Sequence, residues 1–171
     1  SFYYSNMKPG TRKYKTFNTA GLCFPEKHYM VDPLKRLKNV ERLIDEELYF
    51  TIHAPRQTGK TTYLYALSKK LNHDGHYIAS VVSFERAGYS SITMEKANKT
   101  LIHCVYDAAV RFLPEQERPE NPEGKKYLDL KSYLTNWCSQ QAKPVVLFID
   151  EIDALMDDIL VSVLRQFRDR Y

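Results

Sequence analysis

Residues 52–64, IHAPRQTGKTTYL, place a glycine, a lysine and a threonine in the order found in phosphate-binding loops. Such loops read Gly, four residues, then Gly-Lys-Ser/Thr. Gly59 would let the backbone turn, Lys60 would contact the β- and γ-phosphates of a nucleotide, and the Thr61 hydroxyl would ligate Mg²⁺. The pattern puts its first glycine at position 54, where this chain has Ala54. Because that position ends a predicted strand, we expect the methyl group to be tolerated.

The loop as a whole is predicted to bind the nucleotide. Its successive backbone N–H groups would surround the β-phosphate, and the start of the following helix would add partial positive charge. Thr62 would lie near the α-phosphate, whereas Arg56 and Gln57 would contact phosphate or support the neighbouring helix. The predicted phosphate-binding residues are Ala54, Pro55, Arg56, Gln57, Thr58, Gly59, Lys60, Thr61 and Thr62.

A pair of acidic residues follows a second apolar segment, VVLFIDEID, at residues 145–153. Two carboxylates at the end of a buried strand are unfavourable unless they meet a cation or a partner. Ligands of parallel sheets bind at this end of the strands. We therefore predict that Asp150 holds Mg²⁺ through its water shell and that Glu151 deprotonates the attacking water. The alternative is that the acids cap the next helix, for which Asp153 is also a candidate.

The elements needed to position these residues are indicated by apolar patterns and capping residues. Three short segments rich in β-branched and aromatic residues predict buried strands at 48–54, 77–84 and 144–150. Helical spacing and caps predict helices from Asp32-Pro33 to about Glu47, from Gly59 to residues 72–75, from Thr93 through Phe112, from Asp129 onward, and over 154–169. Residues 114–126 contain three prolines and predict an exposed loop. Alternating strands and helices predict an α/β fold, a parallel sheet with helices on both faces.

Composition is that of a single globular domain. The 171 residues are 43% hydrophobic and 27% charged, without an apolar run long enough to span a membrane. The three cysteines, at positions 23, 104 and 138, do not have metal-ligand spacing and predict free thiols in the cytoplasm.

A basic tail carries the net charge of +4. Lys8, Arg12, Lys13 and Lys15 account for the whole excess of 25 basic over 21 acidic residues. Residues 1–16 are therefore interpreted as a solvated tail, with DNA binding left open, and residues 1–6 as a cloning remnant.

FTIHAPRQTGKTT and VVLFIDEID resemble the prokaryotic AAA-like ATPases, which are related to the signalling and origin-recognition branches of the P-loop superfamily. In that family the loop variant PRQ-x-GKT/S is common, so Ala54 is no departure. The resemblance extends from about Phe17 to residue 171 and includes HYMVDPLKRL. It implies that Tyr29, Met30 and Val31 contact the adenine base.

Residues and resemblance together predict Mg²⁺-dependent ATP binding and hydrolysis by a nucleotide-driven switch in a larger protein. ATP is preferred over GTP because no Asn/Thr-Lys-x-Asp motif is present. The alternative function is a non-hydrolysing nucleotide-binding scaffold or a DNA-binding module. The expected partners are ATP and ADP, further domains and a second copy of the chain, but no membrane.

The resemblance also implies a sheet that continues beyond residue 171. In the resembling families a strand lies between the phosphate-loop strand and the Asp-Glu strand, and it follows the last helix predicted here. We therefore expect residues 17–171 to be the N-terminal part of the ATPase domain, incomplete at its C-terminus. The gap would be filled by the remaining polypeptide or a partner, which would also supply the sensor residue and an arginine.

Overall fold

The computed structural model describes residues 27, 32, 34, 39–53, 58–90 and 93–168. The chain divides into two compact units, residues 1–63 and residues 64–171.

The described part of the first unit contains one complete α-helix, which is short. This helix, α1 (Val40–Asp45), buries Val40 and Ile44 and ends close to Glu47, as the sequence predicted. At the predicted start of the helix, the Asp32 carboxylate accepts the N–H of Leu34 at 3.0 Å, which is the bond expected of a capping residue.

The strand predicted at residues 48–54 is not formed where the structure describes this segment. Residues 48–53 have no regular secondary structure, and the side chains of Leu48 and Tyr49 are 49% and 57% exposed. Aromatic and β-branched residues favour a strand only where neighbouring strands pair with it and a core covers it. The sheet formed by the described residues contains only two strands, from elsewhere in the chain. The prediction of a buried strand here was wrong because composition does not supply a pairing partner.

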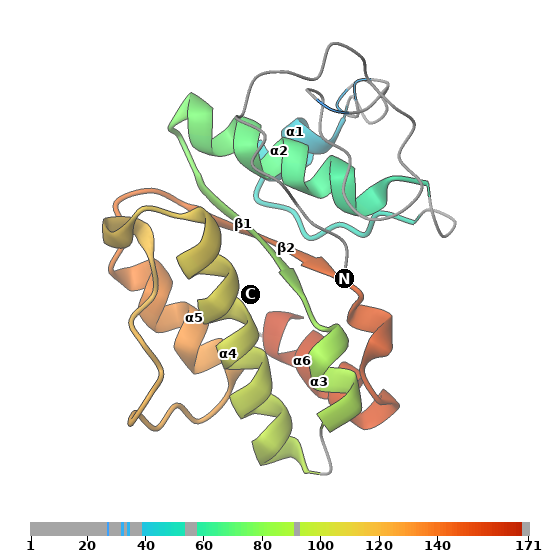
Figure 1. The fold of residues 1–171 in the computed structure, drawn as a ribbon, viewed down its shortest axis with the longest axis vertical. Coiled ribbons are helices and arrows are strands. Elements are labelled where there is room, and N and C mark those ends of the chain that lie inside the picture. Colours follow the sequence, from blue (N-terminus) through green and yellow to red (C-terminus); the bar gives the residue numbers. More distant parts are fainter. Residues whose placement is uncertain are drawn as a thin grey trace, which may run out of the picture. The chain divides into compact units, whose positions relative to one another are not determined.

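The second unit alternates helices and strands (Figure 1). In chain order the elements are α2 (Lys60–Asp74, beginning in the first unit), β1 (Ile78–Ser83), α3 (Glu85–Ser90), α4 (Met94–Phe112), η2 (Glu115–Glu117), α5 (Leu130–Ser139), β2 (Val145–Asp150), η3 (Ile152–Ala154) and α6 (Asp157–Arg168). The short helix α3 was not predicted, and α6 begins three residues later than predicted. No described helix is long and apolar enough to cross a membrane.

The two strands form a parallel pair in which Ile78 lies opposite Val145 and Ser83 lies opposite Asp150. Ile78 and Val82 belong to the core cluster that α4, α5 and α6 build on one face. Side chains alternate between the faces of a strand. Val81 and Phe148, which lie opposite each other, are accordingly buried but do not belong to that cluster. The same is true of the buried leucines of α2, which are Leu64, Leu67 and Leu71. The predicted α/β fold with helices on both faces of a parallel sheet is confirmed.

Local capping explains where α4 and α5 begin. The Thr93 hydroxyl accepts the N–H of Lys96 at 3.3 Å. The Asp129 carboxylate accepts the N–H of Ser132 at 2.8 Å, and the Ser132 hydroxyl accepts the N–H of Asp129. The two bonds together form a capping box. Both caps were predicted from the sequence.

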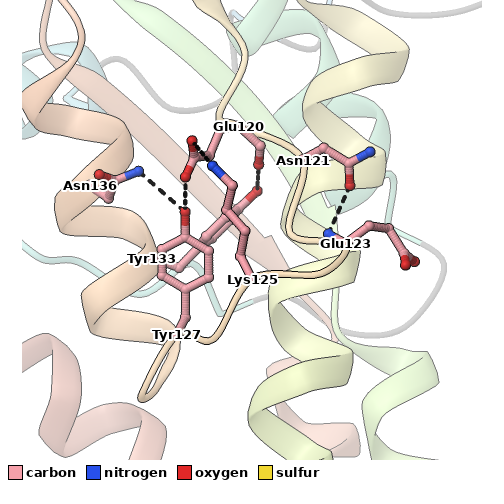
Figure 2. A network of polar contacts seen from close by, with 7 residues as sticks. All are labelled: Glu120, Asn121, Glu123, Lys125, Tyr127, Tyr133 and Asn136. Atoms are coloured by element: carbon pink, nitrogen blue, oxygen red, sulfur yellow. Dashed lines mark hydrogen bonds and ion pairs between the residues drawn. The ribbon is translucent and has the colours of Figure 1, made fainter.

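Residues 114–126 form a loop in which most residues are exposed, as predicted, but part of the loop is fastened to α5. Pro119 and Pro122 are buried. Trp137 Nε1 donates to the Glu117 carbonyl at 3.0 Å, and the Tyr133 hydroxyl donates to the Glu120 carbonyl at 2.9 Å. Figure 2 shows the Glu120 carboxylate receiving bonds from Lys125 and from the Tyr127 hydroxyl. Aromatic donors distant in sequence therefore hold a proline-rich segment in place.

Candidate functional site

The described part of the predicted phosphate loop is Thr58 to Thr62, and it forms a helix start. Gly59 has φ +83, a conformation that favours glycine. Its carbonyl accepts the N–H of Tyr63 at 2.9 Å, so Gly59 precedes the first turn of α2. The earlier loop residues 54–57 and the predicted base-contacting residues 29–31 lie outside the described residues.

The first turn of α2 contains Lys60 and Thr61 and no acidic residue. Lys60 is half-buried and Thr61 is exposed. N–H groups in a first helical turn lack acceptors within their helix, and the helix dipole is positive there. This end of α2 is therefore chemically suited to an anion such as phosphate.

The predicted acidic pair lies at the carboxyl end of β2, in the second unit. Asp150 is the last residue of the strand and is only 4% exposed. Its Oδ1 accepts the N–H of Glu151 at 3.1 Å. Glu151 itself is exposed, so its carboxylate is accessible to water.

Glu151 is held in a left-handed backbone conformation, with φ +56 and ψ +36. For a residue with a side chain this conformation costs about 1–2 kcal/mol. Backbone strain of this kind persists where surrounding contacts enforce it, and it is concentrated at functional sites. The alternative interpretation was that the acids, including Asp153, cap the next helix. Asp153 does not cap α6, because it lies within η3 and α6 starts only at Asp157.

Ser83 orients the Glu151 carboxylate, and sequence reasoning missed this residue. Ser83 Oγ donates to Glu151 Oε2 at 2.6 Å. Ser83 Oγ also accepts the N–H of Glu85 at 3.3 Å. Its own hydroxyl proton therefore remains available for the bond to the Glu151 carboxylate. The available signal was a hydroxyl residue at the carboxyl end of a neighbouring predicted strand.

Within the described residues, no three His, Cys, Asp or Glu side chains gather as a metal-binding group. Magnesium commonly binds through one or two protein ligands together with substrate phosphates and water. Asp150, in the second unit, and Thr61, in the first, each offer an oxygen of the kind that magnesium binds.

A family model described as an AAA domain matches residues 44–171. The chain belongs to this family. AAA domains are nucleotide-binding ATPases, and the matched range contains both the Gly59-Lys60-Thr61 triplet and the Asp150-Glu151 pair. No curated protein and no solved structure matches the chain.

Proposed function

We propose that this AAA domain binds ATP with Mg²⁺ and hydrolyses it. The proposal is supported above all by the burial of Asp150 and the fixed orientation of Glu151. Asp150 is buried at the end of β2, and the exposed Glu151 carboxylate beside it is fixed by Ser83 at 2.6 Å. An exposed, oriented carboxylate next to a buried one is suited to proton abstraction and cation binding, which are different tasks.

Residues 54–62 would hold the phosphates. Lys60, in the first turn of α2, supplies a positive charge to the β- and γ-phosphates. The Thr61 hydroxyl and Asp150, the latter through water, would hold Mg²⁺, which neutralises charge on the phosphates when bound. Tyr29, Met30 and Val31 are proposed to contact the base.

Glu151 is proposed to act as the general base. Its carboxylate takes one proton from a water molecule, the water oxygen bonds to the γ-phosphorus, and the bond from that phosphorus to the bridging oxygen breaks. Lys60 stabilises the negative charge that collects on the leaving ADP. Ser83 contributes by holding the Glu151 carboxylate in one orientation.

The domain is further proposed to act as a switch in a larger protein. Residues 17–171 would be the N-terminal part of the ATPase domain, and residues 1–16 a basic tail. Partners would be ATP and ADP, further polypeptide and a second copy. ATP hydrolysis by the full-length protein, measured with and without DNA, would separate this function from the alternative of a DNA-binding module.

Removal of the Lys60 charge tests the phosphate site. Lys60→Ala should weaken Mg·ATP binding at least tenfold by isothermal calorimetry, because a cation facing phosphate contributes about 1.5–3 kcal/mol. Lys69→Ala, an exposed lysine on the same helix, is the matched control and should retain the parent affinity. Equal affinities in all three proteins would overturn the phosphate-loop proposal.

A further inference from the structure

The side chain of Asn72 pairs with both backbone polar groups of Ala79. Asn72 Nδ2 donates to the Ala79 carbonyl at 2.8 Å, and the Ala79 N–H donates to Asn72 Oδ1 at 2.7 Å. Ser68, one turn earlier on α2, donates its hydroxyl to the same carbonyl at 2.8 Å. Ala79 is fully buried and Ser68 is 5% exposed. These three residues are called the α2–β1 clamp.

The clamp satisfies an edge of the sheet that β2 does not reach. In a parallel pair, successive residues of a strand turn their polar groups to opposite sides. The Ile78 N–H donates to the Pro144 carbonyl at 2.9 Å, so Ala79 faces away from β2. A primary amide offers the same donor and acceptor as a peptide group. Asn72 therefore takes the place of a neighbouring strand at Ala79.

Apolar contacts alone would not fix the position of α2 along β1. Leu64, Leu67 and Leu71 are buried, but hydrophobic burial is non-directional. A slip of one residue would move a helix by about 1.5 Å and rotate it by about 100°. The donor and acceptor of Asn72 match one residue of β1, so they select one rotation and one translation of the helix.

We infer that Asn72 is a positioning residue for nucleotide chemistry. It fixes the axis and rotation of α2, whose first turn carries Lys60 and Thr61. This inference rests on the proposed ATPase function. Misplacement of a substrate-binding group by about 1 Å is enough to lower turnover about 10²-fold, so a clamp three turns away acts on the reaction without touching the nucleotide.

Two asparagine variants of the full-length protein test the inference. Asn72→Ala removes the clamp amide. Asn98→Ala is the matched control: it removes a buried asparagine whose Oδ1 accepts the N–H of Leu130 at 3.3 Å between α4 and α5. We expect Asn72→Ala to lower ATP turnover about 10- to 100-fold. Asn98→Ala should lower the melting temperature but keep the parent turnover.

The pH dependence of ATP turnover in Asn72→Asp distinguishes a positioning role from a merely structural one. A protonated carboxyl group has the donor and acceptor of the amide, whereas a carboxylate repels the Ala79 carbonyl. The turnover of Asn72→Asp relative to the parent should therefore be low at pH 8 and recover toward pH 5.5. Taking the ratio at each pH removes the pH dependence that both proteins share.

The outcomes separate the inference from the function on which it rests. Parent-like turnover in Asn72→Ala, equal losses in Asn72→Ala and Asn98→Ala, or a pH-independent ratio for Asn72→Asp would each overturn the positioning role. Absence of Mg·ATP turnover in the parent would overturn the proposed function and this inference together. Faster amide exchange at Ala79 in Asn72→Ala, with lowered turnover, is the result expected.

Discussion

Ser83 Oγ lies 2.6 Å from Glu151 Oε2, although 68 residues separate the two in the chain. The contact joins the carboxyl ends of β1 and β2, where Ser83 lies opposite Asp150 in the register. Two parallel strands thus bring a hydroxyl donor to a carboxylate whose backbone is in the left-handed region. The contact holds the proposed general base in one orientation.

Ser83→Ala should lower the ATP turnover number about tenfold and leave the KM for ATP nearly unchanged. The reason is that the hydroxyl orients Glu151 and is not proposed to touch the nucleotide; a hydrogen bond to a charged group contributes about 1.5–3 kcal/mol. Ser83→Thr keeps the hydroxyl and should keep most of the activity. Ser139→Ala, at the end of α5, is the control. A parent-like turnover number in Ser83→Ala would remove this residue from the site.

Ser80→Ala should leave the protein as stable as the parent or stabilise it by about 1 kcal/mol. Ser80 is 1% exposed, and its hydroxyl has no hydrogen-bond partner among the described residues. An unpaired buried hydroxyl is unfavourable, so its removal relieves a cost. Ser68→Ala is the matched comparison and should destabilise, because the Ala79 carbonyl loses a bond. Chemical denaturation of both variants checks this, and a destabilised Ser80→Ala would show that the hydroxyl is paired.

Alkaline pH should weaken the packing of residues 114–129 on α5 through Tyr127. Burial, followed by the hydrogen bond to Glu120, raises the pKa of Tyr127 to about 12 from an ordinary value near 10. A group whose folded pKa is raised contributes stability that is present below the unfolded pKa and is lost as pH rises through the folded value. We therefore expect the free energy of unfolding to fall between about pH 10 and pH 12.

Tyr127→Phe provides the measurement, because phenylalanine does not titrate. The free energy of unfolding of this variant should depend less on pH above 10 than that of the parent. Burial also raises the pKa of Tyr133, and the neighbouring Tyr127 raises it further, so the variant reports the titration of both tyrosines. Parallel pH profiles for the parent and Tyr127→Phe would contradict the assignment.

The elements that sequence predicted correctly carry local signals. Thr93 and Asp129 cap α4 and α5 through residues three positions later, and both strands of the sheet are short segments rich in apolar and β-branched residues. Such signals are contained within a few neighbouring residues, so they can be read without knowledge of the fold.

The features that sequence missed depend on residues distant in the chain. Residues 48–53 have strand composition but no sheet partner among the described residues. The loop at residues 114–126 is held by Trp137 and Tyr133, which lie on α5. In the candidate site, Lys60, Thr61, Asp150 and Glu151 were recognisable from their motifs. Ser83 was not, because its role depends on the register of two strands.

The most direct test of the proposed function is the separation of ATP binding from ATP turnover in Glu151→Gln. The amide keeps the shape of the side chain and removes the base, so Mg·ATP affinity by calorimetry should match that of the parent. Phosphate release should fall ~10²–10⁴-fold. Glu115→Gln, an exposed acid remote from the site in sequence, should behave as the parent, and chelation of Mg²⁺ should abolish turnover in every protein. If Glu151→Gln releases phosphate as fast as the parent, Glu151 is not the base and the proposed mechanism is wrong.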